Sequence, residues 1–416
     1  MHQKADRDQI RRQNRSIILQ ALRRTGTRAR IDLGRQTHLS PATVTSITSD
    51  LIAENIVTGV EDTGQKTKAA RGRPRALLSL NADAACVLAI KISVNTIDLA
   101  LVDYRGLRIA RARALFDSAT ATAEDFGRTL VAATLRFLDE DARRARPAIV
   151  SVAAQGVVDD AAGTVTWSPA FVVRHVPVVG PLVAALGVAC RLSNDTNMIA
   201  EALHRSDPAR YGGTFAVIFM DYGVGMGLFV NDRLFVGETG AAAEIGHANH
   251  MPGGALCRCG RRGCLEAYLA DYAIQRHALG LDPATPPADI PMPPDTIARL
   301  IDEAERGNAR ARQAFAAAGE ALGYAIARLV ASLDPGRIVV TGGAIPAWPL
   351  IQASVHAALR EALVEDLRCH VIIEPVDWEE DLALRGTVAR GLHELDTRVF
   401  AEPAAATTAA TLEGTA

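Results

Sequence analysis

One short stretch of the chain holds four residues of the kinds that bind metal ions. His247, Cys257, Cys259 and Cys264 fall within eighteen positions, and the turn between the last two cysteines reads Gly-Arg-Arg-Gly. One imidazole and three thiolates form a complete tetrahedral donor set for zinc, which leaves no open position for a reacting water. We therefore predict a structural zinc site. The alternative is a chance cluster of free cysteines beside a surface histidine.

The other three cysteines stand apart from this cluster. Cys86, Cys190 and Cys369 lie in apolar contexts and are expected to be buried thiols, which is typical of a reducing compartment. The N-terminal residues lack the apolar stretch of a signal peptide. No run approaches the roughly 18 apolar residues of a membrane span. We therefore expect a cytoplasmic protein that does not contact a membrane.

Charge is distributed unevenly along the chain. The 416 residues are 49% hydrophobic and 22% charged, as in an ordinary soluble protein, and the net charge is −2. Residues 1–80 nevertheless carry 15 basic and 7 acidic side chains, whereas the remainder carries 30 and 40. A basic module on an acidic body is typical of a DNA-binding domain fused to another domain. A solvated basic face would give the same count.

Three helices are predicted within residues 1–80. The first covers Ile10–Arg24 and includes Ile10 among its apolar residues. The second follows a Thr27 cap, with Ile31 and Leu33 facing inward. A short break then leads to the third helix, which begins at Ser40. Two helices joined by a short turn predict a helix-turn-helix.

The third helix has the features of a recognition helix. Ser40 is a strong N-cap, and Pro41 follows in the first turn, where its missing N–H costs nothing. Its apolar face repeats at helical spacing through residues 44, 47 and 51. Its other face carries small polar groups that can approach bases and phosphates closely. With Ser40, the candidate DNA contacts on this helix are Thr43, Thr45 and Ser46.

A winged extension is predicted after the third helix. Short apolar strands at 56–60 and 76–80 enclose a polar loop. At the end of this loop stand four further candidate DNA contacts, Arg71, Gly72, Arg73 and Pro74. Arginines held extended by glycine and proline can lie along a narrow minor groove. The alternative is a flexible basic linker.

The body of the chain, residues 81–398, contains two segments with the same order of elements. Three short apolar runs predict a β-meander, followed by a helix and a buried strand. The same order returns in the second half, so we predict an α/β duplication with a cleft between two lobes. The tail, 399–416, is rich in Ala, Thr, Pro and Gly and is expected to be disordered. The predicted meanders cover 86–92, 97–103 and 107–115, and then 215–220, 227–230 and 233–236.

The motif around the cysteines resembles a known family. The run AEIGH at 243–247, followed by CRCGRRGCLE at 257–266, resembles the signature of the ROK family (repressors, open reading frames, kinases). With a winged helix-turn-helix before it, the chain is similar to the xylose and N-acetylglucosamine operon repressors of that family. The resemblance implies an actin/hexokinase-like fold of two α/β lobes, with a monosaccharide in the cleft. It also implies a homodimer or homotetramer.

Five residues are candidate sugar contacts. Asn194 and Asp195 follow an apolar strand, and amide and carboxylate groups suit the vicinal hydroxyls of a sugar. The resemblance implies that this pair grips the sugar, with Asp195 at the general-base position of the kinases, and that Glu244, His247 and Glu266 complete the site. His247 would then bind zinc with one ring nitrogen and the sugar with the other. The alternative for Asn194 and Asp195 is a helix cap or turn.

Catalysis is expected to be lost. ROK kinases hold the ATP phosphates and their metal ion with an Asp-x-Gly-Gly-Thr loop, whereas the matching stretch Lys91–Thr96 has neither aspartate nor glycine. A second loop, Asp221–Gly227, keeps three glycines, and Gly342-Gly343 resembles the nucleotide-side turn. Gln155 stands where the family has proline. We therefore predict a sugar-responsive repressor of carbohydrate metabolism genes that binds operator DNA, with no catalytic residues.

Two other functions stay open at this point. The first is an ATP-dependent hexose kinase that carries a DNA-binding module. The second treats the cysteine cluster as a zinc finger that contacts DNA. This second alternative is disfavoured because the cluster lies some 180 residues beyond the basic module, within the acidic body.

Overall fold

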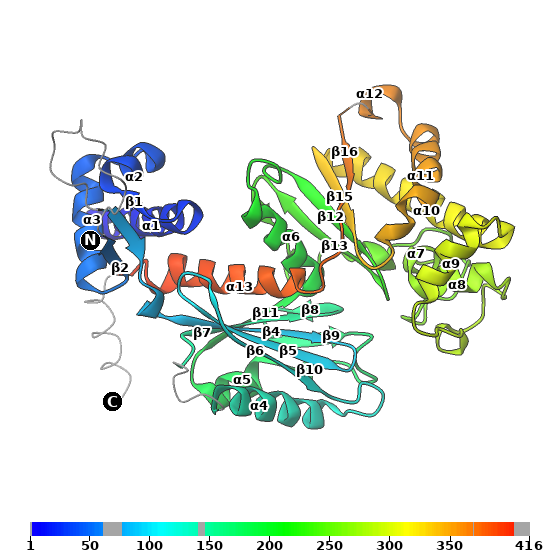
Figure 1. Ribbon diagram of the computed structural model, residues 1–416, viewed down its shortest axis with the longest axis horizontal. Helices are drawn as coiled ribbons and strands as arrows, with labels where there is room; N and C mark the ends of the chain where they lie inside the picture. Colours follow the sequence, from blue (N-terminus) through cyan, green and yellow to red (C-terminus); the bar gives the residue numbers. More distant parts are fainter. Residues whose placement is uncertain (1, 61–76, 140–145, 369, 403–416) are drawn as a thin grey trace.

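The computed structural model describes residues 2–60, 77–139, 146–368 and 370–402. The expected contacts Arg71, Gly72, Arg73 and Pro74 therefore lie outside the described residues, as does Cys369. Cys86 and Cys190 are buried, as expected. The chain forms a small N-terminal unit and two larger α/β lobes (Figure 1).

The N-terminal unit is a winged helix-turn-helix. Its three helices pack around Leu33, Val44 and Leu51, whose side chains are at most 1% exposed. A three-stranded antiparallel sheet in the order β1-β3-β2 completes it. The elements are α1 (His2–Thr25), β1 (Arg28–Ala29), α2 (Arg30–Thr37), α3 (Pro41–Ala53), β2 (Val57–Val60) and β3 (Leu77–Leu80).

Three details of this unit differ from the prediction. Thr27 does not cap α2: the N-cap is Ala29, without a side-chain hydrogen bond, because residues 28 and 29 form β1 and pair with β3. Ile31 is 55% exposed and Ile10 is 56% exposed, so neither faces the core. A helical period of apolar residues is too weak over one or two turns to decide which face is buried.

The two lobes have sheets of identical topology, which confirms the predicted duplication. The first sheet has the order β6-β5-β4-β7-β11, and the second has the order β14-β13-β12-β15-β16. In each, an antiparallel meander of three strands continues into two parallel strands. The carboxyl ends of the parallel strands are where side chains of such folds meet a ligand.

The first lobe also carries a small sheet that the sequence did not predict. This sheet has the order β10-β9-β8 and folds over the end of the lobe. The elements of the lobe are β4 (Cys86–Ser93), β5 (Thr96–Asp103), β6 (Arg108–Leu115), α4 (Ala123–Asp139), β7 (Ile149–Ala154), β8 (Val157–Asp159), β9 (Thr164–Trp167), β10 (Val176–Pro177), α5 (Val179–Leu186) and β11 (Ala189–Asn194).

The second lobe is built around the long helix α10. By length and composition α10 could cross a membrane, contrary to expectation, but 67% of its apolar window is buried inside the protein, so it is a core helix. The elements are β12 (Phe215–Met220), β13 (Val224–Val230), β14 (Arg233–Leu234), η2 (Ile245–His247), α7 (Glu266–Leu269), α8 (Asp271–Ala278), η3 (Pro287–Asp289), α9 (Thr296–Glu305), α10 (Ala309–Leu333), β15 (Arg337–Thr341), η4 (Ile345–Ala347), α11 (Trp348–Ala362), α12 (Glu365–Arg368) and β16 (Ile372–Pro375).

Two helices join the lobes to each other and to the N-terminal unit. Helix α6 (Asp195–Ser206) leaves the first sheet, and α13 (Leu382–Glu394) packs against it so closely that a Cβ at Gly386 would lie 1.7 Å from the Met198 carbonyl oxygen. Figure 1 shows α13 lying along the first lobe's sheet and pointing at α1. The short helix η5 (Leu395–Val399) follows α13.

The segment that follows α13, η5 and the residues after it, binds the N-terminal unit directly. Both oxygens of the buried Asp396 carboxylate accept hydrogen bonds from Arg23 on α1, at 2.6 and 2.8 Å, and Oδ1 also accepts one from the Tyr104 hydroxyl. Residues 399–402, expected to begin a disordered tail, are ordered instead. The Phe400 ring meets Tyr104 edge-on, and its carbonyl accepts a bond from Arg15. Residues 403–416 lie outside the described residues.

Candidate functional site

The five candidate sugar contacts line one cavity. Its other walls include Gln155, Trp167, Thr196 and Phe219. Of these four, sequence reasoning singled out only Gln155. The cavity measures about 40 Å³, far below the roughly 300 Å³ at which small-molecule pockets begin, so a sugar would need the lobes or side chains to move apart. The candidates that line it are Asn194, Asp195, Glu244, His247 and Glu266.

Asn194 caps helix α6, which was the alternative to a sugar contact. Its amide oxygen accepts hydrogen bonds from the backbone N–H groups of Thr196 and Asn197, and its amide nitrogen donates to the Gly156 carbonyl at 2.8 Å. An amide nitrogen carries two N–H bonds, so one donor remains for a ligand. The cap therefore fixes this residue at the cavity wall and leaves it one free hydrogen-bonding group.

Asp195 and Glu244 are acids with strongly perturbed ionisation. Burial raises the pKa of Asp195 to about 6, while Lys91 opposes this rise. Burial also raises the pKa of Glu244 to about 7, aided by the nearby carboxylates of Asp195 and Glu266. The Glu244 carboxylate makes no hydrogen bond to any residue that the structure describes. Two buried acids poised near neutral pH suit the acceptance and exchange of hydroxyl protons.

The four predicted zinc ligands converge. One donor atom from each of His247, Cys257, Cys259 and Cys264 can be chosen so that all lie within 4.8 Å of one another. The Cys257 Sγ to His247 Nδ1 distance is 3.8 Å, and the Cys259 Sγ to Cys264 Sγ distance is 3.7 Å. Tetrahedral zinc with bonds of about 2.3 Å to sulfur separates its ligands by ~3.8 Å, so the donor set fits zinc.

The loop that brings the thiolates together depends on two glycines. Gly260 and Gly263 have φ angles of +85° and +82°, which L side chains rarely adopt. A Cβ at Gly263 would also lie 1.9 Å from the Met251 carbonyl oxygen. Burial raises the pKa of the Cys264 thiol to about 11 and that of Cys257 further, so deprotonation requires a cation nearby.

The candidate metal centre and the cavity share the side chain of His247, and Glu266 lies between them. His247 presents Nδ1 to Cys257 and also lines the cavity, where its ring meets Trp167 edge-on at 4.9 Å between centroids. Glu266 accepts a hydrogen bond from the Cys257 thiol at 3.4 Å and lines the same cavity. A metal ion at this centre would therefore set the orientation of His247, one of the candidate sugar contacts. This position, inside the second lobe, also argues against a DNA-binding finger.

The stretch expected to replace the kinase phosphate loop is mostly strand. Lys91 belongs to β4 and pairs with Asp98 across the β4–β5 hairpin, and only residues 94 and 95 form the turn. The Asn95 N–H donates to Ser118 Oγ at 2.6 Å, and the Asn95 side chain accepts a bond from the Ser118 N–H. Both bonds tie the turn to Ser118. The Asn95 N–H is therefore already used and cannot donate to a phosphate, as the backbone of a phosphate-binding loop must.

The glycines of the second loop are explained by packing. A Cβ at Gly225 would lie 2.2 Å from Thr196 Oγ1, and one at Gly227 would lie 2.6 Å from the Thr196 carbonyl oxygen. Strand β13 can pack against α6 only if these positions lack side chains. Gly342, with φ +119°, likewise approaches the Met220 carbonyl oxygen. These glycines therefore need no nucleotide to account for them.

The candidate DNA contacts on α3 divide into two kinds. Ser40 is the predicted N-cap: its Oγ accepts a hydrogen bond from the Thr43 N–H at 3.1 Å and contacts the Thr43 hydroxyl. Thr45 and Ser46 are exposed on the face opposite the core. Thus two hydroxyls order the start of the helix, and two point to solvent. Sequence reasoning did not single out Arg35, which is also exposed on α2.

Comparison with known proteins places the chain in a family. Residues 87–390, about three quarters of the chain, match the model of the ROK family. The chain belongs to the ROK family. This ROK protein is 25% identical over 365 residues to the DNA-binding transcriptional dual regulator NagC of Escherichia coli (strain K12), a match that covers 88% of each chain. It is also 27% identical to the glucokinase of Streptomyces coelicolor (strain ATCC BAA-471 / A3(2) / M145), over 52% of this chain and 70% of the glucokinase.

A solved structure supports the fold over nearly the whole length. The crystal structure of a ROK family transcriptional regulator, a homolog of the E. coli Mlc protein, covers 94% of this chain and 99% of its own. The TM-score is 0.78 at 21% identity, so this likeness concerns the fold alone. The ROK chain therefore has the expected actin/hexokinase-like body behind a winged helix-turn-helix.

Proposed function

We propose that this ROK protein is a sugar-responsive transcriptional repressor of carbohydrate metabolism genes. One observation carries the proposal: a capped helix with exposed hydroxyls and a cavity lined by five hydroxyl-binding side chains belong to one chain. The likeness to NagC supports the same function. Residues 1–80 would bind operator DNA, and residues 81–398 would sense the sugar.

The effector is a monosaccharide or a derivative of one. Asp195 Oδ1 accepts the Thr196 N–H at 2.8 Å, whereas Oδ2 bonds to no residue that the structure describes and is available to a sugar hydroxyl. Glu244 and the free N–H of Asn194 supply further partners. Because hydroxyls both donate and accept, a wall of carboxylates with one amide donor can satisfy adjacent hydroxyls.

Zinc is the proposed cofactor, with a structural role. His247, Cys257, Cys259 and Cys264 would hold it, and the two 3.7–3.8 Å contacts support this assignment. When bound, the ion supplies charge that keeps the thiolates deprotonated and fixes the imidazole through Nδ1. His247 then presents Nε2 to the cavity, and Glu266 stays in the same wall through the hydrogen bond that it accepts from the Tyr272 hydroxyl at 3.4 Å.

DNA recognition is assigned to α3. Thr45 and Ser46 would contact base edges in the major groove. Ser40 and Thr43 would fix the first turn of the helix, so that its exposed backbone N–H groups can bind DNA phosphates. Arg71, Gly72, Arg73 and Pro74 are proposed to follow the adjacent minor groove. A homodimer would place two such helices on two half-sites.

Coupling between the sites would run through α13. This helix starts near the cleft, where Lys91 Nζ reaches the Glu380 carbonyl oxygen at 3.5 Å, and it ends where Asp396 holds Arg23. A sugar that shifts one lobe against the other would move α6 and α13 as a packed pair, and the Asp396–Arg23 contact would carry that motion to α1. The sugar must bind the two lobe arrangements with different affinities for this to alter DNA binding.

A gel shift on the DNA upstream of the protein's own gene, titrated with a panel of monosaccharides, tests the function. The expected result is a shifted band that one sugar alters at constant salt. No shift at any salt concentration would overturn the proposal, because phosphate contacts alone give binding at low salt. A variant lacking residues 1–80 serves as the control: if it still shifts the DNA, a zinc finger is the DNA-binding element.

The second candidate function is an ATP-dependent hexose kinase. Its support is the raised pKa of Asp195, about 6, at the position of the kinase general base, together with the likeness to a glucokinase. The closed turn at Asn95 favours loss of catalysis. An assay of sugar-dependent ADP release with glucose, N-acetylglucosamine, fructose, mannose and xylose decides between the two. Turnover that disappears in Asp195→Asn would establish the kinase.

A further inference from the structure

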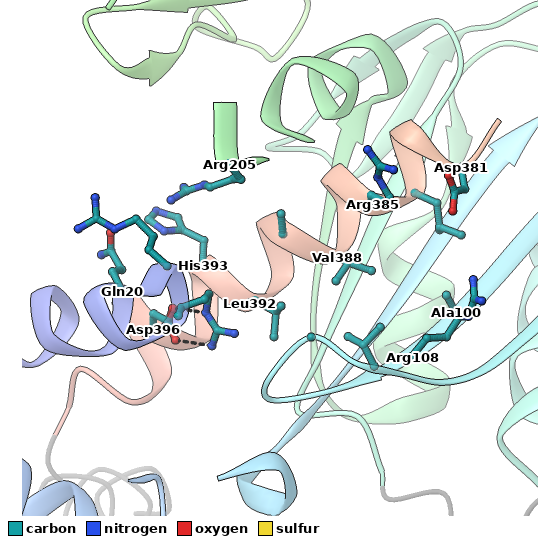
Figure 2. Close-up of a pocket in the computed structure, with 16 residues that line it drawn as sticks. Gln20, Ala100, Arg108, Arg205, Asp381, Arg385, Val388, Leu392, His393 and Asp396 are labelled. Carbon is teal, nitrogen blue, oxygen red and sulfur yellow. Dashed lines mark hydrogen bonds and ion pairs between the residues drawn. The ribbon is translucent and has the colours of Figure 1, made fainter. Parts of the chain in front are cut away.

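A second and larger cavity lies where the N-terminal unit meets the body. It measures about 460 Å³, within the roughly 300–1,000 Å³ range of small-molecule sites. Its walls come from α1, the β5–β6 hairpin, the end of α6 and the length of α13. Figure 2 shows α13 running through this junction cavity, with Gln20 and His393 at the α1 end and Asp381 and Arg108 at the other. None of its lining residues belongs to the sugar cavity.

The junction cavity combines an apolar floor with a basic rim. Leu384 and Leu392 of α13 are 5% exposed and form part of the floor. Five arginines line the cavity against two aspartates, so the wall carries an excess of positive charge. The remaining apolar lining residues include Ala100, Val102 and Val388, and the arginines are Arg23, Arg24, Arg108, Arg205 and Arg385.

Most of these charges already have partners. Arg23 satisfies Asp396, and Arg205 donates to the Glu201 carboxylate at 2.9 Å. Arg385 is paired with Glu379. Two lining arginines make no ion pair with any residue that the structure describes: Arg24, which is exposed one residue beyond Arg23 on α1, and Arg108 at the opposite end. The α1 end of the cavity therefore contains a cation without a partner.

A buried polar atom at the same end also lacks a partner. His393 lines the cavity, and its Nδ1 is buried without a hydrogen bond to any described residue. Burial, and then the charge of Arg205, lowers the pKa of His393 to about 4, so the imidazole is neutral at pH 7 and carries one N–H. Buried polar atoms in proteins are almost always satisfied, so this unpartnered nitrogen, at the same end of the cavity as Arg24, points to an absent hydrogen-bonding partner.

We propose that the junction cavity binds a small organic anion, with its oxyanion group at the Arg24 end and its apolar part against α13. The anion would bridge α1 and the sensor body, because Arg24 belongs to the N-terminal unit and the floor belongs to the body. Such a bridge would stabilise the arrangement in which α1 contacts the body through the Arg23–Asp396 ion pair. The bridging consequence rests on the proposed function, whereas binding of the anion does not.

Calorimetry on the full-length protein tests binding with phenyl phosphate as the probe. This molecule joins an apolar ring to a phosphate and has no sugar hydroxyls for the other cavity. We expect saturable binding of phenyl phosphate, and at least tenfold weaker binding of inorganic phosphate and of benzyl alcohol, each of which supplies only half of the chemistry. Absence of saturable binding by phenyl phosphate would overturn the proposal.

Two variants locate the site. Arg24→Gln removes the unpaired cation at the α1 end, and Ala389→Trp fills the cavity from α13 without altering charge. Each is expected to weaken phenyl phosphate binding at least tenfold. Arg233→Gln is the matched control, because Arg233 is exposed on β14, has no ion pair with a described residue and lies outside the cavity. Wild-type affinity in both Arg24→Gln and Ala389→Trp would refute the site; if one variant does not fold, the other decides.

DNA affinity in the presence of phenyl phosphate tests the bridge. Titration of labelled upstream DNA should give a dissociation constant that changes at least threefold on saturation with phenyl phosphate in wild type, and less in Ala389→Trp. Calorimetric binding without any change in DNA affinity would overturn the bridge while supporting the site. A protein that binds phenyl phosphate but no DNA at all would count against the proposed function, not against the anion site.

Discussion

Replacing Asp195 with asparagine should stabilise the ligand-free protein while abolishing sugar binding. Burial raises the pKa of Asp195 from 3.8 to about 6, even with Lys91 nearby. At neutral pH the Asp195 carboxylate is ionised in both states, but only in the folded state is that charge buried. Its ionisation therefore lowers the free energy of unfolding. The difference between the two pKa values corresponds to ~3 kcal/mol.

The sign of the effect fixes its pH dependence. The folded protein holds the Asp195 proton more tightly than the unfolded chain does, so the cost is absent below pH 3.8. It grows as pH rises from 3.8 to about 6, and it is complete above that value. At pH 5.0 it is about half of its full size. Asparagine has no charge and keeps an oxygen that can accept the Thr196 N–H.

Thermal unfolding of wild type and Asp195→Asn at pH 7.5 and pH 5.0 measures this cost. The midpoint should rise by several degrees at pH 7.5 and by roughly half as much at pH 5.0. Asp289→Asn, at an exposed aspartate that does not line the cavity, is the matched control and should change neither midpoint. A less stable Asp195→Asn, or an equal gain at both pH values, would refute the reasoning. Calorimetry with the effector sugar should show no binding to Asp195→Asn.

Three further outcomes are expected. Ser40→Ala removes the N-cap of α3, which should cost about 1 kcal/mol of stability and weaken DNA binding in an anisotropy titration, whereas Ser40→Asn, a neutral N-cap, should retain most of both. Gly263→Ala places a Cβ against the Met251 carbonyl, so metal analysis should find much less zinc per chain; full zinc content would contradict the predicted loop. Asp396→Asn weakens the bond to Arg23, and limited proteolysis should then cleave near α1 sooner; an unchanged cleavage rate would show that the contact does not hold the N-terminal unit.

Much of the site was predictable because its residues are close in sequence. The four proposed metal ligands lie within eighteen positions of the sequence, so residue type and spacing alone predicted that their donor atoms would converge. Ser40 capped its helix as predicted because capping depends on local backbone geometry. The matched meanders also followed from local pattern, since each strand is a short apolar run.

The missed features depend on residues far apart in the chain. The Arg23–Asp396 pair joins positions 373 residues apart, and no local pattern marks either member. Trp167 reaches the cavity only because β9 folds over the first lobe in a small sheet that the sequence did not predict. Thr27 lost its capping role because pairing of β1 with β3 overrode the local preference.

The central claim is that one sugar, bound in the cavity beside the metal loop, changes the affinity of the N-terminal unit for DNA. Fluorescence anisotropy of labelled upstream DNA, with and without the sugar identified by the panel, measures this directly in wild type and Asp195→Asn. We expect the sugar to change the dissociation constant of the wild-type DNA complex at least fivefold. The variant should still bind DNA, but its dissociation constant should not respond to the sugar. An equal sugar response in both proteins would contradict it.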